Sequence, residues 1–176
     1  MIFTETKLKG SYIVEIEKNE DERGFFARTW DENEFQKNSM NSKFIQCSIS
    51  YNKKRGTLRG MHFQKKPYEE SKLVSCKKGS IFDVIIDLRP NSETFTEWFG
   101  VELNSRDYKS VFVPEGFAHG FQSIEDESEV FYQITNLHMP SHSSGVRWND
   151  SKFGIKWPID NPIISKRDLE WDDFTG

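Results

Sequence analysis

The sequence predicts an all-β protein, either a β-sandwich or a jelly-roll barrel, built from many short antiparallel strands. Hydrophobic and polar residues alternate in short runs, which is the pattern of strands in a half-buried antiparallel sheet. Segments rich in Gly, Pro, Asn and charged residues separate these runs and have the composition of turns. Before the C-terminal region, only one segment is typical of a helix.

The segment 80–88, SIFDVIIDL, shows the alternation best. Successive side chains of a strand point to opposite faces, so one face carries Phe82, Val84, Ile86 and Leu88, and the other carries Ile81, Asp83, Ile85 and Asp87. The same reasoning predicts, in chain order, strands at residues 11–17, 25–30, 44–51, 57–63, 72–78, 97–104, 110–114 and 129–135. The turns KKRG, KKG and RPNSE fall at residues 53–56, 77–79 and 89–93. The one helix is DENEFQKN, residues 31–38, which Asp31 can cap.

Length and composition limit the class of protein. A chain of 176 residues fits a single domain, residues 1–176, with a core of its own. The net charge of −4 is spread over mixed signs and 14% of the residues are aromatic, which argues against a disordered tail and against a nucleic-acid-binding protein. We find no apolar run of signal-peptide or membrane-spanning length, so we expect a cytoplasmic protein with no membrane partner. Cys47 and Cys76 lack metal-type spacing and are interpreted as buried thiols.

A metal site is the first hypothesis for the histidines, since small barrels with a strand histidine are often metal-binding cupins. The stretch GTLRGMHFQ supplies His62, but Gln64 stands where a second histidine is expected. The stretch PEGFAH supplies His119 with cupin-like spacing. Two histidines without a nearby carboxylate fall short of the three protein ligands of a catalytic metal, so we predict no metal.

Without a metal, His62 is either a core residue or a functional one. Arg59 and His62 point to opposite faces of a regular strand unless a bulge at Gly60 turns one of them. Lys72 and Tyr132 lie in strand-like runs with apolar neighbours, where an inward polar side chain is costly unless it meets a polar group or a ligand. The structural alternatives are a core aromatic for Tyr132 and a surface charge for Lys72.

Six segments, in order over nearly the whole chain, resemble the dTDP-4-dehydrorhamnose 3,5-epimerase family of nucleotide-sugar epimerases. They are DERGFFARTW, RGTLRGMHFQ, KLVSCKKGSIFDVIIDLRPNSETFTEW, VFVPEGFAHGF, GVRWND and IKWP. The resemblance implies an all-β, cupin-type double-stranded β-helix (jelly roll) with short peripheral helices, no metal and no cofactor. It also implies a homodimer whose N-terminal strands cross into the partner's sheet.

The resemblance further implies the reaction, epimerisation at C3, C5 or both of a nucleoside-diphospho 4-keto-6-deoxy sugar. By this resemblance, His62 is the base and Asp168 the carboxylate that orients it. Lys72 stands at the position that holds the enolate oxygen, and Tyr132 at that of the acid. The alternative for Asp168 is a structural role, as a helix cap or a solvated residue near the C-terminus.

Substrate contacts are implied in the same way. Arg23 and Arg59 stand where the family binds the diphosphate, and Phe26 where it packs near the nucleoside. Gln46 matches a sugar contact, whereas Ser48 replaces a common asparagine. We assign His119 to substrate contact or to support of the base region, and the alternative is a structural role.

Two departures concern the nucleotide. Thymidine-using members typically carry a glutamate where this chain has Arg28, and arginine has no acceptor for the thymine N3 hydrogen. Arg28 could instead donate to guanine or cytosine, or it could bind a phosphate. Leu137 and His138 replace a usual pair of tyrosines, so the sugar could also differ, for example a heptose or a dideoxy sugar.

Three other functions stay open at this stage. A 3,4-ketoisomerase would use similar proton chemistry on a similar substrate. A sugar-nucleotide-binding module would have lost catalysis, and a cupin oxygenase would need a metal. The epimerase is the leading hypothesis, with a role in surface polysaccharide synthesis implied by the resemblance.

Overall fold

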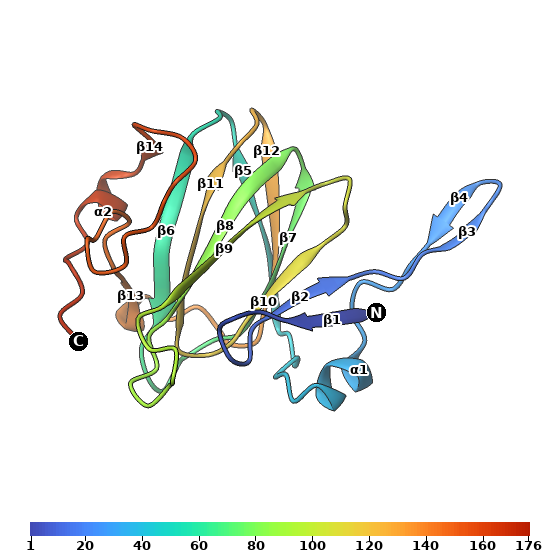
Figure 1. The fold of residues 1–176 in the computed structure, drawn as a ribbon, viewed down its shortest axis with the longest axis horizontal. Coiled ribbons are helices and arrows are strands. Elements are labelled where there is room, and N and C mark those ends of the chain that lie inside the picture. Colours follow the sequence, from blue (N-terminus) through green and yellow to red (C-terminus); the bar gives the residue numbers. More distant parts are fainter.

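The computed structural model describes residues 1–176, and its two main antiparallel sheets face each other (Figure 1). The first sheet has, in spatial order, β1 (Ile2–Glu5), β2 (Tyr12–Glu15), β10 (Ser110–Val113), β7 (Lys72–Lys78), β12 (Ser128–Ile134) and β5 (Gln46–Asn52). The second has β13 (Ser143–Gly145), β6 (Thr57–Gln64), β11 (Phe117–Ser123), β8 (Ser80–Asp87) and β9 (Trp98–Asn104), with β14 (Ile163–Ile164) parallel to β6. The prediction of an all-β jelly roll is confirmed.

The main core lies between the two sheets. Ile81 and Ile85 of β8 are fully buried there, against residues of β7 and β12 such as Val74. The other face of β8 is also covered, because Val84 and Ile86 belong to a second cluster formed with the C-terminal segment. The alternation predicted for this strand is therefore correct, but the expected half-burial is wrong, since the C-terminal segment covers the second face.

The prediction for residues 25–30 is partly wrong. A two-stranded hairpin of β3 (Asn19–Asp21) and β4 (Gly24–Phe26) projects from the body of the molecule, and the strand ends at Phe26 (Figure 1). Beyond Phe26 no strand lies alongside to pair with it, because β3 has only three residues. The chain then runs to Asp31, whose side chain accepts a hydrogen bond from the Glu34 backbone and caps helix α1 (Glu32–Lys37), as predicted.

Several short elements were not predicted. They are β1, β3, β11, β13, β14, a 3-10 turn at Pro140–His142 and helix α2 (Lys166–Leu169). All seven residues of β11 are buried, but Gly120 within the strand and Gly116 just before it give the segment the composition of a loop. No helix is long and apolar enough to cross a membrane.

The cysteines differ from each other. Cys76 is buried, as predicted, and burial raises the pKa of its thiol to about 11. Cys47 is exposed, which corrects the expectation of two buried thiols. It lies on edge strand β5, where the neighbouring residues Gln46 and Ser48 face inward and Cys47 therefore faces out.

Candidate active site

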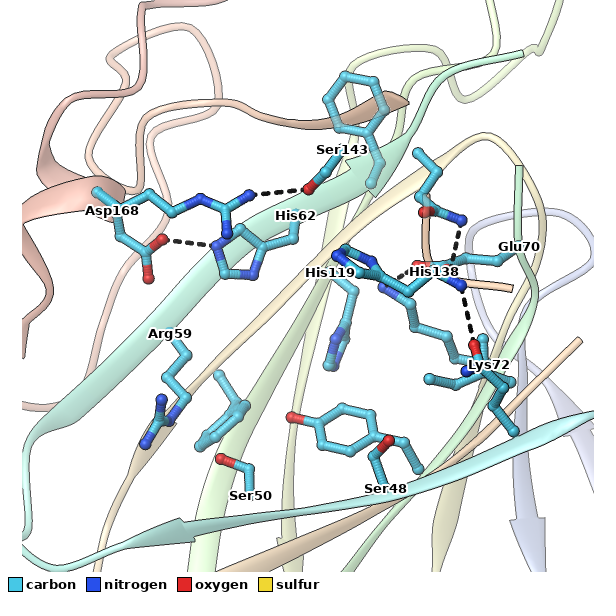
Figure 2. A pocket seen from close by; sticks show the side chains of 17 residues that line it. Ser48, Ser50, Arg59, His62, Glu70, Lys72, His119, His138, Ser143 and Asp168 are labelled. Atoms are coloured by element: carbon cyan, nitrogen blue, oxygen red, sulfur yellow. Dashed lines mark hydrogen bonds and ion pairs between the residues drawn. The ribbon is translucent and has the colours of Figure 1, made fainter. Parts of the chain in front are cut away.

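A cavity of about 400 Å³ opens between the two sheets. Its walls come from β5, β7 and β12 of the first sheet, from β6 and β11 of the second, and from helix α2. Most of the side chains that line it are polar or charged. Figure 2 shows the pair of His62 and Asp168 at one end and the pair of Lys72 and Glu70 at the other.

His62 and Asp168 form a hydrogen-bonded pair. The Nε2 atom of His62 lies 2.7 Å from Oδ1 of Asp168, which is buried at the start of α2. Ser165 caps this short helix by accepting a hydrogen bond from the Asp168 backbone N–H. Burial alone would raise the pKa of Asp168, but hydrogen bonds from His62 and from the Gly60 backbone hold it below its usual range. The carboxylate is therefore ionised at neutral pH and fixes the imidazole.

A β-bulge brings Arg59 and His62 to the same cavity. On β6 these residues are three apart, but their partners on β11, Phe121 and His119, are only two apart. The extra residue on β6 is accommodated at Gly60, whose φ of +146° is unfavourable for other residues. A side chain on Gly60 would also approach the Gly120 Cα to 2.6 Å. The bulge that the sequence analysis required for Arg59 and His62 to share a face is therefore present.

Lys72 begins β7 and lies inside the cavity with only 8% of its surface exposed. Its Nζ atom is 3.0 Å from Oε1 of Glu70. The other oxygen of Glu70 accepts a hydrogen bond from Gln64 Nε2 at 2.9 Å. The sequence analysis missed Glu70, although an acidic residue two positions before an inward-facing lysine was a usable signal.

His119 and Tyr132 line the middle of the cavity. His119 Nε2 lies 2.8 Å from Oδ2 of buried Asp83, and its ring meets the ring of Tyr132 edge-on, with centroids 5.9 Å apart. Burial, and then the charge of Asp83, raise the pKa of the Tyr132 phenol. The phenol is therefore protonated at neutral pH. Asp83 was missed as a partner, although the alternation of 80–88 placed it on a face with two isoleucines.

Edge strand β5 contributes a polar wall made of Gln46, Ser48 and Ser50. Gln46 accepts a hydrogen bond from the backbone N–H of His138 at 2.9 Å, and His138 also lines the cavity. The hydroxyl of Ser50 is buried without a partner in the chain, so it is free to bind a ligand. These hydroxyl and amide groups can form hydrogen bonds with a polyhydroxylated molecule.

Three cations line the cavity. Lys72 is joined by Arg59, whose Nε donates to Asn52 at 2.8 Å, and by Arg167, whose Nη2 donates to Ser143 at 2.9 Å. Arg167 was not identified from the sequence, where its position beside Asp168 was the available signal. Guanidinium groups bind phosphate oxygens well because their donors form a planar fork.

Three predicted contacts lie outside this cavity. Arg23 and Phe26 belong to the projecting hairpin, where Arg23 pairs with Asp21 and 75% of Phe26 is exposed. Arg28 follows the hairpin and lies 3.6 Å from Asp31. Within one chain, none of the three lines the cavity that holds His62.

No group of three or more His, Cys, Asp or Glu side chains in the structure is placed to hold a metal ion. Each of the two cavity histidines contacts one carboxylate, Asp168 for His62 and Asp83 for His119. Each pair is a single contact between one imidazole and one carboxylate, and a carboxylate in such a contact fixes the orientation of the ring.

Comparisons with known proteins agree with this geometry. The family model for dTDP-4-dehydrorhamnose 3,5-epimerase matches residues 5–175. The dTDP-4-dehydrorhamnose 3,5-epimerase of Methanothermobacter thermautotrophicus is 46% identical over 96% of this chain and 92% of its own. The crystal structure of the enzyme from Elizabethkingia anophelis has a TM-score of 0.97 at 38% identity and covers 99% of this chain and 96% of its own. That of the Bacillus anthracis enzyme, with TDP and pyrophosphate bound, has a TM-score of 0.94 at 35% identity and covers 98% and 99%. The chain therefore belongs to the dTDP-4-dehydrorhamnose 3,5-epimerase family and is an epimerase.

Proposed function

We propose that the protein epimerises C3, C5 or both of a nucleoside-diphospho 4-keto-6-deoxy sugar by proton removal and return. The observation that carries this proposal is the pair of His62 and Asp168 in one cavity with Lys72 and Tyr132. The C3 and C5 protons of such a sugar are acidic because both carbons flank the C4 carbonyl. The product serves the synthesis of surface polysaccharide sugars, and the reaction takes place in the cytoplasm.

His62 removes the proton. An imidazole, whose ordinary pKa is about 6.5, suits a base at neutral pH. Because the Asp168 carboxylate accepts a hydrogen bond from Nε2, the proton of the neutral ring is on Nε2, and Nδ1 carries the lone pair. Asp168 also stabilises the imidazolium that forms when Nδ1 takes the substrate proton.

Lys72 and Tyr132 complete the inversion, after which His62 releases its proton to solvent and Tyr132 takes one from solvent. As the C–H bond breaks, its electron pair moves toward the carbonyl, and negative charge develops on the C4 oxygen. The ammonium of Lys72 stabilises that charge, which is largest in the transition state and the enolate. Tyr132 then donates its proton to the carbon from the opposite face, which inverts the centre. Its raised pKa, due to burial, keeps this proton on the phenol until the enolate forms.

The remaining polar residues bind the substrate. Gln46, Ser48, His119 and His138 contact the sugar from the cavity walls. Arg59 binds the diphosphate, to which its planar guanidinium can donate two hydrogen bonds. Arg23, Phe26 and Arg28, on the hairpin and the loop after it, bind the nucleotide. Because they lie outside the cavity of their own subunit, they act on the cavity of another subunit.

The proposed arrangement is a homodimer with exchanged N-terminal strands, in which the hairpin of β3 and β4 from one subunit reaches the cavity of its partner while β1 and β2 stay in the sheet of their own subunit. Two features support it. The hairpin projects from its own subunit with Phe26 largely exposed, and an isolated two-stranded hairpin has little stability of its own (Figure 1). Edge strand β5 also exposes Ile49 and Tyr51, and Ile45 just before the strand is exposed too; exposed apolar edges of this kind are usually covered by another chain.

For the nucleotide, we propose a guanosine or cytidine diphosphate in place of the thymidine diphosphate that the names of the relatives indicate. Arg28 offers only donors, and its present partner Asp31 lies at the long distance of 3.6 Å with the arginine side chain 60% exposed. Such an arginine can leave this weak contact to donate to the O6 and N7 atoms of guanine or to the O2 and N3 atoms of cytosine.

The test is proton exchange in deuterium oxide. The protein is incubated with dTDP-, GDP- and CDP-linked 4-keto-6-deoxy sugars, and C3 and C5 are followed by NMR. Deuterium uptake with inversion at C3 or C5 is the expected result. Movement of the carbonyl from C4 to C3 would identify a 3,4-ketoisomerase, and binding without exchange in any substrate would identify a non-catalytic sugar-nucleotide-binding protein.

A further inference from the structure

Glu70 is the only acidic residue paired with Lys72. The Lys72 Nζ atom lies 3.0 Å from Oε1 of Glu70, and the two side chains are only 10% and 11% exposed. A charged group buried to this extent is stable only if it is paired. The pair lies in the wall of the cavity that contains His62, so the carboxylate acts where the ammonium is needed.

Glu70 is itself held in place. Its Oε2 atom accepts a hydrogen bond from Gln64 Nε2 at 2.9 Å. Gln64 is 4% exposed, donates to the carbonyl of Tyr68 at 2.8 Å and accepts from the Met139 N–H at 2.6 Å. The chain of contacts from Gln64 through Glu70 to Lys72 therefore ends on fixed backbone groups, which makes the position of the ammonium rigid.

We propose that Glu70 is a positioning residue that fixes the ammonium of Lys72 in the orientation in which Lys72 holds the enolate oxygen; this inference rests on the proposed function. A lysine carries three donors on a long, flexible stem. One donor engaged with Glu70 fixes the stem and leaves two donors for the cavity. The oxygen-binding donors are then in place before the reaction begins, which is the condition for stabilising a transition-state charge.

This role makes two predictions that a purely structural role does not. Loss of the carboxylate should reduce kcat more than it raises KM, since the contact to the C4 oxygen strengthens as charge develops there. The effect should also disappear when Lys72 is absent, since Glu70 acts only through Lys72.

The experiment is a double-mutant cycle with Glu70→Gln and Lys72→Ala, measured by deuterium exchange and by steady-state kinetics. We expect Glu70→Gln to lower kcat roughly 10- to 100-fold, the effect of misplacing a catalytic group by about 1 Å, with KM changed less than about 3-fold. In the Lys72→Ala background the same substitution should change the remaining rate less than about 2-fold. Glu70→Asp keeps the charge on a shorter stem, so it should recover part of the lost kcat.

Glu69→Gln is the matched control, because Glu69 is the adjacent carboxylate and lies outside the cavity lining. It should keep wild-type kcat. The positioning role would be overturned if Glu70→Gln lowered kcat by the same factor with and without Lys72. It would also be overturned if Glu70→Gln raised KM and left kcat unchanged. Should Glu70→Gln fail to fold, as judged by its thermal unfolding, the cycle is measured with Glu70→Asp in its place: an equal loss of kcat with and without Lys72 counts against the role. No exchange by the wild-type protein would instead overturn the proposed function itself.

Discussion

The Nε2 atom of His62 lies 2.7 Å from Oδ1 of Asp168, although the two residues are 106 positions apart in the sequence. His62 is carried by β6 and Asp168 by the short helix α2, which lies against that strand. The contact therefore exists only when the C-terminal segment has folded onto the second sheet. Folding of this segment orients the imidazole and excludes solvent from the Asp168 carboxylate.

His62→Ala should abolish deuterium exchange at both C3 and C5, because no base then remains in contact with Asp168. The Kd for the nucleotide, measured by calorimetry, should change by less than about 3-fold, since binding is assigned to other residues. Exchange of both protons at the wild-type rate would show that a different residue is the base. His142→Ala is the matched control; this histidine is outside the cavity lining and should leave exchange unchanged.

Tyr132→Phe should separate exchange from inversion. The base is intact in this variant, so deuterium still enters the substrate, but the acid on the opposite face is lost. We expect inversion to fall roughly 10²- to 10⁴-fold at one centre, the usual contribution of a general acid. NMR of the recovered sugar measures both quantities in one sample. Inversion at both centres at wild-type rates would reject Tyr132 as the acid.

The strands were predictable because their alternation is a local property. Residues 80–88 are an example, since their periodicity alone correctly placed Ile85 and Val84 on opposite faces. β11 was not predictable, because its burial depends on β6 and β8 on either side and its glycines are typical of loops when read locally. Gly120 is needed there for close contact with Gly60, which only the three-dimensional structure reveals.

The site was predictable only in part. The resemblance to the family identified His62, Lys72 and Tyr132, all of which line one cavity. The sequence offered a signal for Glu70, which lies two positions before Lys72, and for Asp83, which the alternation of 80–88 turns inward, but only side-chain distances show which residue each carboxylate contacts. Neither carboxylate is adjacent in sequence to the residue it contacts.

Subunit mixing tests the exchanged hairpin. One variant carries Arg23→Ala and Phe26→Ala on the hairpin, and the other carries His62→Ala in the cavity; each alone should be nearly inactive. When the two are mixed, unfolded and refolded together, half of the dimers are hybrids, and each hybrid has one cavity of two complete. About a quarter of wild-type activity should return if the hairpin serves the partner's cavity. If it serves its own cavity, no activity should return.

Asp87 should make stability depend on pH. It is fully buried, which alone would raise the pKa of its carboxyl, but hydrogen bonds from Arg89, Ser92 and Thr94 hold that pKa below its usual range. The pKa of Asp87 is lower in the folded state than in the unfolded state, where it is about 3.9. The carboxylate therefore stabilises the fold fully at a pH above the unfolded-state pKa, and this stabilisation is lost as the pH falls through the folded-state pKa.

Asp87→Asn should therefore lower the free energy of unfolding by about 2–3 kcal/mol at pH 7, the contribution of hydrogen bonds to a charged group. Urea unfolding at several pH values measures the free energy of unfolding of both proteins. The difference between wild type and Asp87→Asn should be constant above about pH 5 and shrink below about pH 4. Asp160→Asn, at an exposed position without an ion pair, should show no such difference. A difference that stays constant down to pH 2 would exclude the carboxylate charge as its cause.

Arg28 should determine which nucleotide the protein accepts. Arg28→Glu replaces a group that only donates hydrogen bonds with one that only accepts them, so it should favour thymine, whose N3 hydrogen needs an acceptor. We expect the ratio of kcat/KM for the dTDP-linked sugar to that for the GDP- or CDP-linked sugar to rise roughly 10- to 100-fold, about 1–3 kcal/mol for one base contact. Arg28→Ala removes the donor without adding an acceptor, so it should weaken the preference of the wild type without creating a preference for thymine. If both variants keep the wild-type ratio, Arg28 does not contact the base, and its role is limited to the phosphates or to the cap of α1 through Asp31.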